Sequence, residues 1–150
     1  MPIATAPRLL AVAALAALPV LATATPASAA PAGESWDTIF TVARAGLCVG
    51  RIDPSVGYGG LPNGGALLNF QATLWGVGDC RVTITADWTN TDNGRSGSVS
   101  QEITGPGYHH YGAEPRLYPG PGHVEVTFTM DAAAVPAPAH GRWIMPDYEN

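Results

Sequence analysis

Apolar and polar residues alternate along several stretches of this chain. The clearest stretch is Cys80 to Thr89, where every second residue is apolar and the residues between are polar. Strict alternation of this kind is typical of a β-strand with one buried face. Leu68 to Trp75 and His123 to Asp131 show the same period. These segments predict three strands whose apolar side chains share one core.

Turn residues indicate how the strands are connected. Gly76 to Asp79 is predicted to form a short hairpin loop, and Asn93-Gly94 a two-residue type I′ turn. The run through Val99 to Thr104 then pairs back, which completes a meander. After the first 29 residues, helix is expected only at 132–134, before two prolines. Weaker strands are expected at 38–44, 47–52 and 142–145, which gives about seven in all.

One-sided antiparallel strands separated by turn residues favour an all-β fold, a small antiparallel β-sandwich. Cys48 and Cys80 are the only cysteines, and we expect them to form a disulfide. The predicted architecture resembles immunoglobulin-like domains in its short strands, its one disulfide and its core tryptophan. The resemblance is limited to general architecture, because the cysteines are only 32 positions apart and Trp75 is the only tryptophan between them.

The first 29 residues differ in composition from the rest of the chain. Twenty of them are apolar, against 49 of the remaining 121. Arg8 precedes the uncharged run Leu9 to Ala22, and Ala27-Ser28-Ala29 supplies the small residues of a cleavage site. We therefore expect a helical signal peptide at 1–29, cleaved before Ala30, and secretion through the general route. The run has fourteen residues and a membrane span needs about 20, so no stable membrane anchor is expected after cleavage.

The rest of the chain is interpreted as one domain with flexible ends. Residues 30–37 are expected to be a flexible segment and 38–150 a single sandwich domain, with a Pro/Ala spacer at 132–141 before the last short strand. All seven cations are arginine, which together with the surplus of Ala, Gly and Pro suggests a bacterial source. The chain carries a net charge of -5 and its arginines are scattered, which excludes a nucleic-acid partner.

The stretch 105–122 is expected to be a long loop with a binding role. It holds three of the five tyrosines and two of the four histidines, and a third histidine, His123, follows it directly. Tyrosines dock at low entropic cost, so binding loops favour them. The ligand-binding candidates are Tyr108, His109, Tyr111 and Tyr118. The alternative is that these side chains only cover the edge of the core. A second Gly/Pro-rich loop is expected at 52–66, either lining a groove with two of these tyrosines or serving as a plain connection.

Metal binding is the first alternative function. The candidate ligands are His109, His110, His123 and Glu125, which would suit zinc or copper, and Glu114 could join them. His123 and Glu125 are two apart on a predicted strand and so share a face. Neighbouring histidines in an extended chain point in opposite directions, however, and no familiar ligand spacing occurs. We therefore expect no metal and no other cofactor.

A small secreted hydrolase is the second alternative. Asp87, Glu102, Glu114 and Glu125 could supply a carboxylate pair, but the chain contains no nucleophile elbow, no zinc-protease motif and no phosphate loop. The sequence therefore predicts a secreted, non-enzymatic protein. Its expected partner is an extracellular protein or an envelope glycan, bound through the loop 105–122.

Overall fold

Strands form 77% of the part of the chain that this computed structural model describes, namely residues 33–43, 45–58, 61, 65–111 and 116–147. The expected signal peptide lies outside these residues. None of the described residues is helical, so they contain no helix able to cross a membrane. The ten strands are β1 Gly33–Ser35, β2 Ile39–Val42, β3 Ala45–Tyr58, β4 Ala66–Asn90, β5 Ser96–Gly105, β6 Gly107–Tyr111, β7 Arg116–Leu117, β8 Gly122–Met130, β9 Ala134–Val135 and β10 Ala139–Met145.

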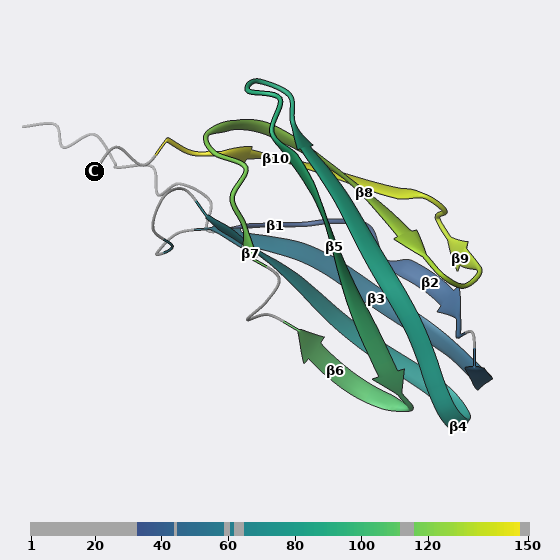
Figure 1. The fold of residues 1–150 in the computed structure, drawn as a ribbon. Coiled ribbons are helices and arrows are strands. Elements are labelled where there is room, and N and C mark those ends of the chain that lie inside the picture. The colour runs from purple at the N-terminus through teal and green to yellow at the C-terminus, as the bar shows by residue number, and fades with distance from the viewer. Residues whose placement is uncertain (1–32, 44, 59–60, 62–64, 112–115, 148–150) are drawn as a thin grey trace, which may run out of the picture.

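The ten strands form one antiparallel sheet that curls into a half-barrel (Figure 1). The strand order is β10-β8-β4-β3-β2-β9; β1 also pairs with β3, and β5, β6 and β7 also pair with β4. The all-β class is confirmed. A sandwich of two separate sheets and a count of seven strands are not confirmed, because β4 runs for 25 residues and joins both halves of one sheet.

The hairpin expected at Gly76 to Asp79 is wrong. Leu68 to Leu74 pairs with β3 on one side, and its part from Phe70 onward pairs with β6 on the other. After the glycines, Cys80 to Thr89 pairs with β5 and Ile84 to Asn90 pairs with β8. The two halves of β4 therefore do not pair with each other. Gly76 and Gly78 both have positive φ, and the β3–β4 register shifts beside them, so the segment is a bend within one strand.

Other turns also differ from the expectation. Asn90 and Arg95 close a four-residue loop that ends at Gly94, in place of a two-residue turn. Ala132 to Ala134 forms no helix, because Ala134 enters β9. Several segments expected to be irregular contain strands, because their backbones pair with β3, β4 or β8. They are β1 within 30–37, the end of β3 within 52–66, β6 and β7 within 105–122, and the start of β10 within 132–141.

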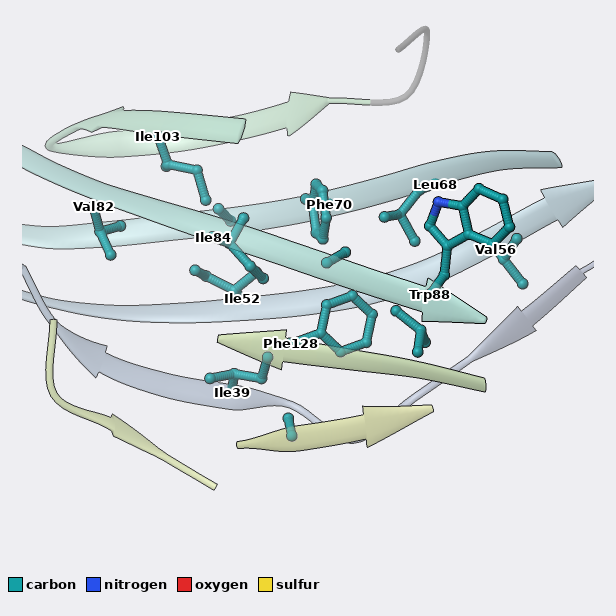
Figure 2. Packing of buried hydrophobic residues seen from close by; sticks show 14 of the residues in the cluster. Ile39, Ile52, Val56, Leu68, Phe70, Val82, Ile84, Trp88, Ile103 and Phe128 are labelled. Atoms are coloured by element: carbon teal, nitrogen blue, oxygen red, sulfur yellow. The ribbon is translucent and has the colours of Figure 1, made fainter. Parts of the chain in front are cut away.

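The alternation of apolar residues correctly predicts the core. The apolar members of both β4 runs are buried, and so are Val124, Val126 and Phe128 of β8. Figure 2 shows side chains from β2, β3, β4, β5 and β8 pointing toward one another inside the curled sheet. Trp143 of β10 is buried as well, so the terminal strand docks as expected.

The disulfide between Cys48 and Cys80 is confirmed, with both cysteines buried and their Cα atoms 5.9 Å apart. It links β3 to the second half of β4, directly beside the bend. Gly76 lies opposite Cys48 in the ladder, and a Cβ there would collide with the Leu47 carbonyl oxygen and lie 2.7 Å from Cys48 Sγ. The close approach of β3 to the bend therefore requires glycine at this position.

Removing the disulfide is expected to destabilise the fold without changing its topology. The Cys48→Ala/Cys80→Ala variant loses the constraint on the unfolded chain, worth about 3 to 4 kcal/mol for a loop of this length. Its thermal midpoint should fall by on the order of 10 °C. Calorimetry of the variant, and of wild type with and without reducing agent, measures this; an unchanged midpoint in both would contradict it.

Asn90, at the end of β4, is a fully buried polar side chain that ties three segments together. Its amide nitrogen donates to the carbonyls of Pro119, Gly120 and Pro121 at 3.1, 3.1 and 2.9 Å, and its oxygen accepts the backbone N–H groups of the adjoining loop. The two amide hydrogens are shared among three acceptors. This residue fixes the segment that leads into β8.

Asn90→Ala should cost about 3 kcal/mol of unfolding free energy, because several buried groups lose their partners together. Asn93→Ala is the matched control. Asn93 donates to the same Pro119 carbonyl at 3.0 Å, but it is exposed and should cost about 1 kcal/mol or less. Urea unfolding of the two variants tests the difference, and equal losses would show that burial of Asn90 is unimportant.

Candidate binding surface

The outer face of the sheet carries large apolar side chains that are open to solvent. Nine large hydrophobic side chains of the described residues are more than half exposed, and seven of these lie together, with exposed fractions from 52% at Trp75 to 85% at Leu47. They come from four neighbouring strands, and we call the set the outer apolar face. Its members are Phe40, Val42, Leu47, Val49, Trp75, Val77 and Val135.

The strand register makes these side chains one continuous surface. Val49 of β3 lies opposite both Val42 of β2 and Trp75 of β4. Leu47 lies opposite Val77, in the next row along the same two strands. Phe40 lies opposite Val135 of β9. Directly opposed residues have Cβ atoms about 5 Å apart, so the side chains touch across the strands.

A hollow of about 330 Å³ runs between these side chains, lined by Phe40, Thr41, Val42, Val49, Gly50, Trp75, Ala133, Ala134 and Val135. Arg51 lies next to Phe40, but its charge is paired with Asp53 at 2.9 Å. Each of these exposed aromatic or aliphatic side chains presents on the order of 100 Å² of solvent-accessible surface. The seven side chains together therefore present roughly 700 Å². Monomers usually show patches of about 300 to 600 Å², and standard interfaces bury about 800 Å² per partner.

Of the four binding candidates from the sequence, only Tyr108 borders the outer apolar face. It is exposed on β6 and lies opposite Thr73, two residues before Trp75. His109 and Tyr111 lie on the opposite face of β6 from Tyr108. Their rings stack with centroids 6.1 Å apart, and Tyr111 packs against the core. Tyr118 is partly exposed after β7. The four residues do not form one site.

The structure does not bring the candidate metal ligands together. His109 and His110 point to opposite faces of β6, as alternate strand residues must. His123 and Glu125 are both exposed on one face of β8, as expected. Within the described ranges, no group of three metal-ligating side chains occurs. His123 Nδ1 instead lies 2.9 Å from the Asp92 carboxylate.

Of the carboxylates considered for hydrolysis, Asp87, Glu102 and Glu125 lie on the solvent side of the sheet. Glu102 faces Arg81, with 3.7 Å between the charged groups. Asp87 and Glu125 are exposed on neighbouring strands, offset by two residues. Glu114 lies outside the described residues.

The outer apolar face was missed because the sequence reasoning followed only the buried phase of each strand. Trp75 stands in the polar phase of its run, after Asn69, Gln71 and Thr73. Val42 and Val49 similarly occupy outward positions of β2 and β3. Apolar residues in the polar phase of several strands were the available signal, but only the strand pairing shows that they meet.

Asp92 joins the β4–β5 loop to β8. Its pKa lies below the ordinary value of 3.8, because the carboxylate is hydrogen-bonded first by the side chain and then by the backbone N–H of His123. A carboxyl group whose pKa is lower in the folded state than in the unfolded state stabilises the fold at any pH above its unfolded-state pKa. This stabilisation is lost as the pH falls through the folded-state pKa.

We therefore expect the free energy of unfolding to decrease below about pH 4 partly through Asp92. Asp92→Asn should weaken this dependence, since it cannot be protonated in that range. Asp37→Asn, which changes an exposed carboxylate between β1 and β2, is the control and should leave it intact. Urea unfolding from about pH 5 to pH 2 measures the slopes; identical slopes for wild type and Asp92→Asn would contradict the assignment.

Comparison with protein-family models, with curated proteins and with solved structures gives no match for this chain.

Proposed function

We propose that this chain is a secreted, non-enzymatic binding protein that docks an apolar surface of a partner protein against its outer apolar face. The observation that carries the proposal is the continuity of seven exposed apolar side chains across four strands. Exposing such an area to water is unfavourable, and covering it with another apolar surface recovers that free energy. Tyr108 extends the surface at one side.

The composition of the face favours a protein partner over a glycan. Five of the seven side chains are valine or leucine, which offer neither donors nor acceptors. A glycan docked on them would lose hydrogen bonds from its hydroxyls to water without replacing them. Protein interfaces, in contrast, have apolar centres with aromatic residues and few charges.

The disulfide is consistent with folding in an oxidising compartment. Together with the leader-like composition of residues 1–29, it supports our proposal of secretion. We also propose that the two halves of β4 divide the curled sheet into two layers, as in a sandwich of general immunoglobulin-like architecture. The first half pairs with β3, β6 and β7 and the second with β5 and β8, which supports this description.

The binding proposal is tested with the double variant Trp75→Ser/Val49→Thr, which makes the centre of the face polar. Both side chains point to solvent, so the thermal midpoint should change little. Tyr118→Ser, which removes a partly exposed aromatic elsewhere, is the matched control. Each protein is immobilised and exposed to the secreted and envelope proteins of the producing cells, and bound proteins are quantified by mass spectrometry.

We expect at least one protein to be retained by wild type and by Tyr118→Ser and reduced at least tenfold by the double variant, because loss of a central tryptophan typically costs about 2 kcal/mol or more. The affinity of that protein, once purified, should show the same order among the three chains. Retention of the same proteins by all three, or by none, would overturn the proposal.

A further inference from the structure

Strand β5 forms a free edge of the sheet. In the described part of the chain its ten residues pair only with β4. The pairing with β4 runs from Ser96 to Gly105 without a shift in register, so the edge is continuous along the whole strand. Figure 1 shows β5 following the second half of β4.

The register of the β4–β5 ladder determines which backbone groups of β5 point away from β4. Asn90 N donates to Arg95 O at 2.7 Å, which makes these two residues a hydrogen-bonded pair. Such pairs alternate along an antiparallel ladder, so the odd-numbered residues of β5 bond to β4. The even-numbered residues therefore direct their N–H and C=O groups to the open side. They are Ser96, Ser98, Ser100, Glu102 and Thr104.

One further contact supports this assignment. The Gln101 side-chain amide donates to the Glu102 carbonyl at 2.7 Å, so that carbonyl is accessible from outside the ladder. The five even-numbered residues also have exposed side chains. The strand has no proline, no lysine and no bulge to protect this row, and Glu102 is its one charge. The exposed contact from Gln101 to the Glu102 carbonyl would be exchanged for a backbone hydrogen bond when another strand pairs here.

We propose that two copies of this chain pair through β5, antiparallel, with Ser100 on the twofold axis. This register brings all five outward-facing residues into the ladder: Ser100 meets Ser100 of the second copy, Ser98 meets Glu102, and Ser96 meets Thr104. The carboxylates of the two copies are then set apart by serines, so no like charges face each other. A second copy fits because the edge is neutral apart from Glu102 and complementary to itself.

This pairing is independent of the proposed function. It uses the edge of β5, whereas the outer apolar face lies on β2, β3, β9 and the first half of β4. The sheet would continue from one copy into the next, and each copy would keep its own outer apolar face. A dimer formed through β5 must therefore persist in Trp75→Ser/Val49→Thr, whereas one formed through the outer apolar face would be lost.

Ser100→Pro and Ser100→Ala make a matched pair. Both lose the hydroxyl that lies 2.8 Å from Thr85 Oγ1, but only proline loses the outward N–H. We expect wild type and Ser100→Ala to be dimers by sedimentation equilibrium and Ser100→Pro to dimerise at least about tenfold more weakly. If Ser100→Pro does not fold, as judged by near-UV circular dichroism, Ser98→Pro with Ser98→Ala repeats the comparison at the next free position.

Cross-linking tests the register. Cα atoms of a hydrogen-bonded antiparallel pair are about 5.5 Å apart, which a disulfide can span. Ser100→Cys should therefore give a covalent dimer on mild oxidation. Ser96→Cys should not, since the two cysteines would lie roughly 27 Å apart. A wild-type protein that stays monomeric, a dimer unaffected by either proline, or equal cross-linking of both cysteine variants would overturn the proposal.

Discussion

The bend between Gly76 and Asp79 carries β4 from one half of the sheet into the other, and the remaining strands take their places on either side of it. Before the bend β4 holds β3, β6 and β7, and after it β4 holds β5 and β8. Positive φ at Gly76 and Gly78 permits the turn of the backbone. The Cys48–Cys80 disulfide then fastens β3 to the far side of the bend.

The same bend determines where the outer apolar face lies. Leu47 and Val77 oppose each other directly beside Cys48 and Gly76, and Val49 and Trp75 form the next row. A surface anchored by a covalent link needs little further ordering when a partner docks, which lowers the entropic cost of binding. The buried residues of each strand stabilise the half-barrel, and the exposed apolar residues near the bend form the surface that we propose binds a partner.

The sequence predicted which residues form the core and the disulfide, because burial on one face of a strand leaves a period of two that needs no knowledge of the partner strand. It failed at Gly76 to Asp79, because two glycines between strands describe a hairpin loop and a bend within one strand equally well. It also failed for β6, whose Tyr, His and Gly residues carry no alternation, although their backbone pairs with Phe70 to Leu74. The seven members of the outer apolar face are spread from Phe40 to Val135. Apolar residues at outward positions of single strands mark some of them in the sequence, but only the pairing of four strands shows that they form one surface.

The central claim is that the outer apolar face is covered when the chain meets its partner. Carbene footprinting of the chain in the culture fluid of its producer, compared with the purified chain, measures this directly. We expect labelling to fall at Phe40, Leu47 and Trp75 in the culture fluid, and to stay constant at Ile144, which is also exposed but lies on β10. Equal labelling of the outer apolar face in both samples would contradict the claim.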